Sequence, residues 1–413
     1  MPRTAFVCSW VFVLQVALAS GADWPQWRGP TRDGVAVGVE LPEPWPAALK
    51  RVWQTEIGLG HSSPVVAGGK VVQLARRGDD EVLACLRAAD GKVLWRSACP
   101  AGPFKPRGVA RYHGKGPFAT PTIAEGRVYA LGISGVLTCH DLGSGKQLWR
   151  KTFAEEYEQA YPIWGAANSP LLLGDLCILC VGSHRAGALA AFNRHTGQLA
   201  WKLADDGAAY ASPQATTLAG KPQLVTLTHS RVVGVEPATG KLLWAVPFKV
   251  RYEMNIITPI LHNDLVVWSG CYEPARAVRI ASDDGALAAT KLWQNDAESM
   301  FMSSPVRHGD HIYGLATRGK GTLVCIALGD GKTVWSSPGG MGKYASLVRV
   351  ADRLLVLTTK GDLLLLAADP SGYNELGRCH LTDRPVWAHL AVAGRRLYVK
   401  DKTHLACFEL AGE

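Results

Sequence analysis

Short apolar runs, separated by polar turns, cover most of the chain. In residues 54–95, such runs open near Ser62, Val71, Glu81 and Trp95, and turns rich in Gly and Asp separate them. Runs of this length, rich in Val and Leu and bounded by turn residues, predict β-strands. The stretch therefore predicts four short strands in succession.

The same unit recurs along the chain. Its mark is a turn glycine with tryptophan four residues later, at residues 91–95, 145–149, 197–201, 240–244 and 331–335; a stretched copy covers 285–293 and a degenerate one 372–376. Gly suits the end of such a turn because it adopts φ > 0 without a Cβ clash. Ser-Pro or Thr-Pro opens the first strand of most units. A period of about 40–50 residues indicates a repeat architecture.

Four strands per repeat are typical of a propeller blade. Fourth strands are expected to start at Trp53, Trp95, Trp149, Trp201, Trp244, Trp293, Trp335 and Leu376. Trp53 has no strands before it, and segment 385–410 has inner strands with no outer strand after them. We predict an all-β, eight-bladed β-propeller of four-stranded antiparallel blades, closed by pairing of N- and C-terminal strands; a seven-bladed ring is the alternative. The repeated tryptophans are expected to pack each blade on its neighbour.

The first 22 residues have the pattern of a secretory signal. Arg3 supplies the positive charge, residues 5–19 are apolar but too short to span a membrane, and small residues favour cleavage after Ala22. Cys8 lacks the small-residue run expected before a lipid-anchored cysteine. We predict a signal peptide (1–22), an N-terminal extension (23–44) and a single propeller domain (45–413). The mature protein is expected to be a monomer in the periplasm or outside the cell, without lipid anchor or transmembrane span.

Charge and cysteine positions disfavour two classes of function, nucleic-acid binding and a cysteine-based metal or redox site. The formal net charge is +9, but the basic residues are scattered, so we expect no nucleic-acid partner. Nine cysteines follow the signal, which leaves at least one unpaired. Cys85, Cys139 and Cys325 share one strand position and are expected to pack as small apolar residues. Cys177 and Cys180 form a CxxC sequence within a strand, where residues three apart face opposite sides, which disfavours a metal or redox site.

The repeat phrase resembles the PQQ-type propeller repeat, whose Ala-x-Asp-x-x-Thr-Gly-x-x-x-Trp pattern has close forms at residues 193–197 and 236–240. Segment 23–34, Asp-Trp-Pro-Gln-Trp-Arg-Gly-Pro-Thr-Arg-Asp-Gly, resembles the start of mature PQQ-like propeller proteins exported by planctomycete-type bacteria. The size and single-domain layout are similar to the BamB-type propeller of the outer-membrane barrel-assembly machinery.

This resemblance implies two kinds of function. Quinoprotein dehydrogenases oxidise alcohols or sugars with PQQ and Ca²⁺, whereas BamB-type proteins catalyse nothing and dock partner proteins. The chain departs from the dehydrogenases because it has no adjacent cysteine pair and no recognisable set of calcium ligands. It departs from the BamB type because it lacks the lipid-anchor cysteine.

Loop lengths locate a candidate binding face. The longest connections, 97–118 and 151–168, run from an outer strand to the next inner strand, and all such connections open at one mouth of the channel. Their aromatic and basic residues suit a ligand or peptide. The expected binding residues are Arg107, Arg111, Tyr112, His113, Lys115, Tyr161, Trp164, Asn168, Tyr210, Arg251, Tyr252, Asn255, Lys343, Tyr344, Trp387 and His389.

No sequence motif predicts catalysis or a metal site. His61, His113 and His389 would ligate a metal only if the blades brought them together. The leading hypothesis is a non-catalytic exported propeller that binds a protein or a small extracytoplasmic ligand at the mouth. The alternative is a PQQ- and calcium-dependent quinoprotein oxidoreductase acting on alcohols or sugars.

Overall fold

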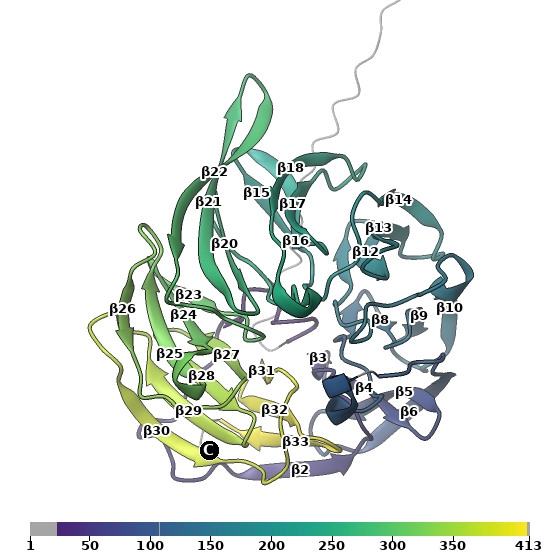
Figure 1. Cartoon of the computed structure of the whole chain (residues 1–413). Coiled ribbons are helices and arrows are strands. Elements are labelled where there is room, and N and C mark those ends of the chain that lie inside the picture. The colour runs from purple at the N-terminus through teal and green to yellow at the C-terminus, as the bar shows by residue number, and fades with distance from the viewer. Residues whose placement is uncertain (1–22, 107, 411–413) are drawn as a thin grey trace, which may run out of the picture.

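A computed structural model describes residues 23–106 and 108–410, and nearly all of its regular structure is β-strand. The strands form eight sheets arranged as blades around a central axis (Figure 1). Four short 3-10 turns lie in connections: η1 (Gly108–His113), η2 (Phe153–Glu155), η3 (Arg251–Glu253) and η4 (Arg318–Lys320).

Blades 1 to 4 each use four consecutive strands. They are β3 (Val65–Ala67), β4 (Lys70–Arg77), β5 (Asp80–Arg87) and β6 (Val93–Pro100); β7 (Thr122–Ala124), β8 (Arg127–Leu131), β9 (Val136–Asp141) and β10 (Gln147–Thr152); β11 (Leu171–Leu173), β12 (Leu176–Gly182), β13 (Gly187–Asn193) and β14 (Leu199–Leu203); and β15 (Gln214–Leu218), β16 (Lys221–Leu227), β17 (Arg231–Val235) and β18 (Leu242–Pro247).

Blades 5 to 7 continue the pattern, and blade 7 gains a fifth strand from the N-terminal segment. They are β19 (Ile260–His262), β20 (Leu265–Gly270), β21 (Glu273–Asp283) and β22 (Ala286–Asn295); β23 (Val306–His308), β24 (His311–Ala316), β25 (Thr322–Ala327) and β26 (Thr333–Ser336); and β27 (Ala345–Val350), β28 (Arg353–Thr358), β29 (Asp362–Ala367) and β30 (Glu375–His380), with β1 (Val35–Ala36) parallel to β27.

Blade 8 closes the ring from the two ends of the chain. Its inner strands are β31 (Ala391–Ala393), β32 (Arg396–Lys400) and β33 (His404–Glu409), and its outer strand is β2 (Arg51–Glu56). β2 is antiparallel to β33, with Trp53 opposite Cys407. The predicted eight-bladed ring with N- and C-terminal pairing is therefore confirmed, and the seven-bladed alternative is wrong. Closure therefore pairs the outer edge of β33 with β2, a strand from the other end of the chain.

The glycine–tryptophan phrase joins neighbouring blades. The indole N–H of Trp53 donates to the carbonyl of Ala88 in the next blade at 2.8 Å. Gly91, with φ +70°, lies against the same ring, and a Cβ added there would be 2.5 Å from Trp53 Cδ2. Equivalent bonds run from Trp95 to Leu142 (3.0 Å), Trp149 to Arg194 (3.0 Å), Trp201 to Pro237 (3.0 Å), Trp293 to Leu328 (2.8 Å) and Trp335 to Asp369 (2.8 Å). The phrases at Gly91, Gly145, Gly197, Gly240 and Gly331 therefore need glycine for close approach to the ring as well as for the turn, whereas Gly372 of the degenerate phrase touches no ring.

Blades 4 and 5 depart from this rule. Trp244 donates instead to Gln223 Oε1 within its own blade at 2.6 Å. The cause lies in blade 5, where β21 and β22 are lengthened and their hairpin projects beyond the ring (Figure 1). This carries Gly285 of the stretched phrase into open space, away from any tryptophan ring.

The Ser/Thr-Pro positions form a second set of links, here called the hydroxyl belt: Ser63, Thr120, Ser169, Ser212, Thr258 and Ser304. All of these hydroxyls except that of Thr258 accept a backbone N–H from an adjacent blade. The bonds run from Ser63 to Thr120 (3.3 Å), Thr120 to Ser169 (2.9 Å), Ser169 to Ser212 (2.9 Å), Thr258 to Ser304 (3.0 Å) and His389 to Ser63 (2.8 Å). The belt ties the first strands together around the channel.

The segment before the first repeat lies inside the ring. Residues 23–36 cross the centre of Figure 1, and their contacts are with the first strands of the blades. Trp24 and Arg28 are each 1% exposed, as buried as the core of a blade. The chain then passes to β2 through residues 37–50. The predicted signal peptide lies outside the described residues.

Candidate functional site: the loop face

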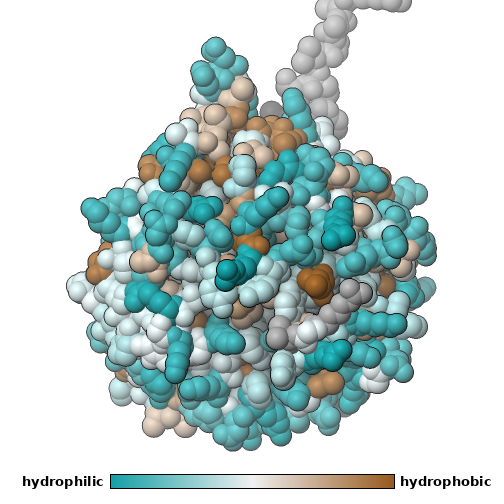
Figure 2. All heavy atoms as spheres, viewed as in Figure 1, coloured by the Kyte–Doolittle hydropathy of each residue, from teal (hydrophilic) through white to brown (hydrophobic). Residues whose placement is uncertain are grey.

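Two sets of connections open on the same end of the ring. Because strands alternate in direction within a blade, the connection from a fourth strand to the next first strand shares this end with the connection from second to third strand. We call this end the loop face; η1 and η3 stand near its centre in Figure 1. β6 continues to Pro100, so residues 97–100 of the predicted long connection are strand. Figure 2 shows that this face is mainly hydrophilic, with small hydrophobic spots.

Five rings meet on the side of blades 7, 8 and 1. This aromatic cluster consists of His61, His113, Phe118, Tyr344 and Trp387. The His113 ring meets the Trp387 ring edge-on, with their centroids 4.7 Å apart. The Tyr344 ring stacks on Trp387 and the His61 ring on Phe118, with centroid distances of 5.9 and 5.3 Å. Three of the predicted residues are thus brought together from three separate connections.

The imidazoles of the aromatic cluster are uncharged at neutral pH. Burial and then the neighbouring His113 lower the pKa of His61 to about 3. Burial and then the exposed Lys343 lower the pKa of His113. His113 Nδ1 lies 3.4 Å from His61 Nε2, so one ring donates and the other accepts. The cluster offers flat, neutral ring surface with a lysine at its edge.

A different cluster lies across the channel, between blades 3 and 4. This imidazole cluster consists of His184, Tyr210, His229 and Glu253. His184 Nδ1 is 2.9 Å from the carbonyl of Ala208, which can only accept, so Nδ1 carries the proton. Neutral Nε2 then accepts from the Tyr210 hydroxyl at 3.0 Å. Glu253 Oε2 lies 3.7 Å from the same nitrogen, and the His229 ring lies 4.9 Å from that of His184.

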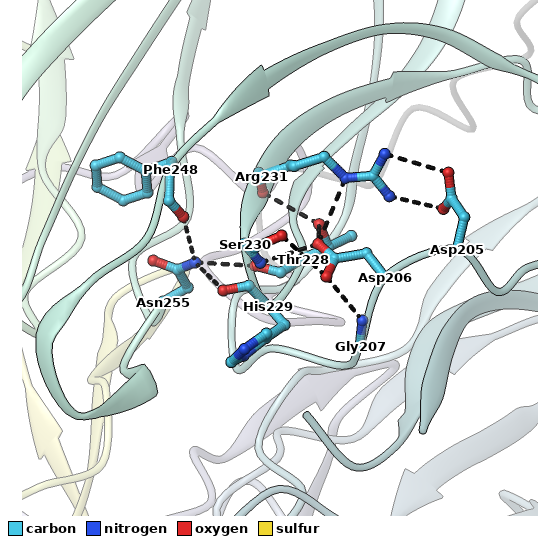
Figure 3. Close-up of polar contacts among 9 residues, drawn as sticks. All are labelled: Asp205, Asp206, Gly207, Thr228, His229, Ser230, Arg231, Phe248 and Asn255. Atoms are coloured by element: carbon cyan, nitrogen blue, oxygen red, sulfur yellow. Dashed lines mark hydrogen bonds and ion pairs between the residues drawn. The ribbon is translucent and has the colours of Figure 1, made fainter. Parts of the chain in front are cut away.

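A partly buried carboxylate fixes the loop that carries His229 (Figure 3). Asp206 accepts from the Thr228 hydroxyl at 2.6 Å, from Ser230 N–H at 2.9 Å and from the Ser230 hydroxyl at 3.0 Å. Burial opposes the charge of Asp206, but the hydrogen bonds from Thr228 and Ser230 outweigh it and hold the pKa of Asp206 below its ordinary value. From the other side, Asn255 donates to the carbonyls of Thr228 and His229 at 2.9 and 3.0 Å.

The other predicted residues fall into two groups. An exposed rim is formed by Arg111, Tyr112, Lys115, Arg251, Tyr252 and Lys343, of which Tyr112 is 90% and Tyr252 61% exposed. A second group is engaged within the fold: the Asn168 amide pairs with both backbone groups of Cys180, Tyr161 donates to the carbonyl of Pro103, the Trp164 backbone N–H donates to the Tyr210 hydroxyl, and His389 lies buried beside Trp27. Arg107 lies outside the described residues.

Sequence reasoning missed His184, His229 and Tyr272. All three lie in connections between second and third strands, which were not assigned to the face. Tyr272 is 61% exposed, has φ +57° and stacks on Phe301 at 6.2 Å. The signal was available, because strand direction alone places these connections at the same end as the long ones.

Within residues 23–106 and 108–410, no group of three or more His, Cys, Asp or Glu residues is arranged to hold a metal ion. Of the three histidines considered as metal ligands, His61 and His113 lie within hydrogen-bond distance of each other. His389 is engaged elsewhere, because its Nδ1 donates to the carbonyl of Leu390 at 2.8 Å. The nine cysteines of this described part are all free. Cys177 and Cys180 belong to different core clusters on opposite faces of β12, and burial raises the pKa of Cys180 to about 12.

Eight blades joined through a repeated Gly–Trp phrase define the class of PQQ-repeat β-propellers. A model of one family, described as outer membrane protein assembly factor BamB, matches residues 46–130 and 80–337, and the chain belongs to this family. A curated relative, outer membrane protein assembly factor BamB of Shewanella oneidensis, is 25% identical over 318 residues, which is 70% of this chain and 70% of that protein.

Solved structures share the fold at low sequence identity. BamB from Moraxella catarrhalis matches with a TM-score of 0.63 and 15% identity, over 88% of this chain and 98% of that one. Quinohemoprotein alcohol dehydrogenase from Comamonas testosteroni also matches with a TM-score of 0.63, at 14% identity, over 96% of this chain and 82% of that one. The fold therefore serves both a protein-assembly factor and an enzyme.

Proposed function

We propose that this protein is a non-catalytic extracytoplasmic propeller that binds a partner protein at its loop face in an assembly or scaffold role. The observation that carries the proposal is the exposed rim around two internally bonded clusters. Tyr, Trp and Arg are the usual anchors of protein interfaces, and Tyr offers large contact area at low entropic cost. Tyr112 and Tyr252 of the rim present such area, and Tyr272 on the same face is likewise 61% exposed.

Membership of the BamB family supports both the assembly role and an extracytoplasmic location. The signal-like first 22 residues support export to the periplasm or beyond. In the described part of the chain, no helix is long and apolar enough to cross a membrane. A monomer without nucleic-acid partners remains our expectation.

The test is partner capture through the rim. Arg111→Ala, Tyr112→Ala and Tyr252→Ala are combined in one variant, which removes exposed side chains and leaves both clusters intact. The matched control combines Lys146→Ala, Leu148→Ala and Lys241→Ala, which are also exposed but lie on outer strands and turns at the other end. Cross-linking in an extracytoplasmic extract, followed by mass spectrometry, should yield a partner lost at least tenfold from the rim variant only. Equal capture by both variants would remove the loop face as the binding surface.

The quinoprotein alternative is favoured by the likeness to alcohol dehydrogenases, but the residues present do not fit PQQ with Ca²⁺. The described residues form no cluster of metal-binding side chains, and the chain has no adjacent cysteine pair. Trp27, Arg28 and Arg32 bond to residues at the starts of first strands lining the channel. Titration with PQQ and Ca²⁺, followed by dye-linked oxidation of alcohols and sugars, tests this directly. Saturable binding with turnover would replace the scaffold proposal.

A further inference from the structure

The plug, residues 23–36, is bound in the channel as a strand-like ligand would be. Its backbone pairs with the free inner edges of first strands: Trp24 exchanges both hydrogen bonds with Val66 at 2.8 Å, Pro25 accepts from Ile123 at 2.8 Å, and Gly34 accepts from Arg349 at 2.8 Å. β1 adds a short parallel pairing with β27. Pairing along exposed strand edges is one of the recurring modes by which proteins bind extended peptides.

Side chains at the tip of the plug reach the hydroxyl belt. Arg32 donates to the carbonyls of Ser169 at 2.9 Å and Pro170 at 3.0 Å. Arg28 donates to the carbonyl of Pro305 at 2.5 Å, and Trp27 Nε1 donates to the Thr258 hydroxyl at 2.9 Å.

The plug therefore touches most of the ring. Its bonds and ring contacts reach blades 1, 2, 3, 5, 6, 7 and 8, the last through the Trp27–His389 contact at 5.2 Å. It recognises the assembled channel rather than any single blade.

The plug also carries unfavourable features. Arg28 and Arg32 are 1% and 2% exposed, yet among the described residues neither forms an ion pair with a carboxylate. Arg28 Nε, Arg28 Nη1 and Arg32 Nε have no hydrogen-bond partner there. Both arginines have φ near +60°, which costs a residue with a side chain. Burying an unpaired charge and unmet donors is costly. Such costs at one segment point to a role for that segment beyond stabilising the ring.

We propose that the central channel is a peptide-binding site for an extended segment bearing Trp-x-x-Trp-Arg-x-x-x-Arg, and that residues 23–36 are its built-in, exchangeable occupant. This site is separate from the partner surface proposed for the loop face. The free strand edges bind the peptide backbone, and the belt carbonyls select guanidinium groups. A segment of the same pattern from another protein competes for the channel whenever the plug leaves it.

The linker after the plug makes the proposal testable. Val37 is 68% exposed, and Gly38 and Glu40 are also exposed, so this stretch accepts a protease site without disturbing a strand. The exported chain carrying such a site is cut, then mixed with a fluorescent synthetic peptide of residues 23–36. We expect saturable one-to-one exchange. Uncut protein should take up little peptide, because its tethered plug has an effective concentration of about millimolar.

Variant peptides identify the selecting groups. A peptide with Arg28→Ala and Arg32→Ala should bind at least tenfold more weakly, because it loses the donors to the belt carbonyls. The matched control, Thr31→Ala, alters a residue that is exposed and bonds only to the plug's own Asp33, and should bind as the parent peptide does. Equal affinity of the arginine variant would overturn the selection by guanidinium groups.

A second protein separates exchange from folding. A chain beginning at Val37 keeps β2 and should form a monomeric ring whose melting temperature rises when the peptide is added. If it does not fold, the cut protein decides the matter. Cut protein that stays folded but exchanges no peptide even on mild warming, or that unfolds on cutting, would overturn the proposal and make the plug a permanent part of the core. The two proposals are tested separately. The rim is unchanged in all these proteins, so failure to capture a partner at the loop face would not count against the peptide site in the channel.

Discussion

The aromatic cluster and the imidazole cluster occupy opposite sides of one face and are held by different forces. In the aromatic cluster, rings from separate connections pack on one another, and burial keeps His61 and His113 neutral. In the imidazole cluster, one carboxylate organises the supporting loop, and a fixed acceptor, the Ala208 carbonyl, sets the tautomer of His184. Packed rings tolerate small changes of shape. Removing the carboxylate, by contrast, leaves its hydrogen-bond donors unsatisfied, which lowers the stability of the fold.

The largest expected effect is on the side with the carboxylate. Asp206→Ala leaves the partly buried donors of Thr228 and Ser230 without an acceptor and should lower the free energy of unfolding by about 2–3 kcal/mol. The neighbouring Asp205, which forms a more exposed pair with Arg231, is the matched control; Asp205→Ala should cost less than about 1 kcal/mol. Chemical denaturation measures both. Similar values would show that Asp206 anchors nothing.

The second prediction is a pH effect to which the aromatic side contributes through His61; His389, beside Trp27, contributes to it as well, because burial lowers its pKa to about 3. His61 binds its proton more weakly in the folded than in the unfolded protein, so the unfolded state takes up protons first as pH falls below about 6.5. Stability is therefore lost on going down from that pH, by up to about 2 kcal/mol at pH 5 for this residue.

The comparison of two variants isolates that effect. His61→Gln should flatten the pH dependence of the melting temperature between pH 7 and 5. His184→Gln should flatten it less, because burial lowers the pKa of His184 but the Ala208 carbonyl and Glu253 raise it in part. The reverse order would show that His184 of the imidazole cluster, and not His61, is the more pH-sensitive of the two.

A third, smaller effect tests the packing itself. Trp387→Ala removes the edge contact with His113 and the stack on Tyr344, and each aromatic pair is worth about 0.5–1.5 kcal/mol. We expect a loss of about 1–2 kcal/mol, most of it restored by Trp387→Phe. If phenylalanine restores nothing, a polar contact of the indole would matter more than the stack.

The two clusters also show what the sequence can predict. The ring was predictable because the Gly–Trp phrase reflects a contact between neighbouring blades, such as that of Gly91 with Trp53. This contact recurs from blade to blade, so it leaves a period in the sequence. The clusters have no period. His113 and Trp387 meet only because two unrelated connections fold toward each other, and Tyr252 and Glu253 reach their places through φ values near +60° that no pattern announces. The place of the plug inside the channel was not predicted, although the sequence marks it as an N-terminal extension, because it precedes the first repeat and its partners are spread over seven blades.

The smallest expected effect on stability concerns the rim that both clusters support. Tyr112 and Tyr252 are largely exposed, so replacing both with Ala should change the free energy of unfolding by no more than about 0.5 kcal/mol. Because Tyr112 stands on the aromatic side and Tyr252 on the imidazole side, the single variants tell which side the partner uses. Capture of the cross-linked partner should fall in the double variant while its melting temperature stays that of the parent. A partner that responds to Tyr252→Ala alone binds over the carboxylate-fixed loops, and one that responds to Tyr112→Ala alone binds over the packed rings. If capture falls only in variants that also lose stability, the rim is a cover for the clusters and not an interface.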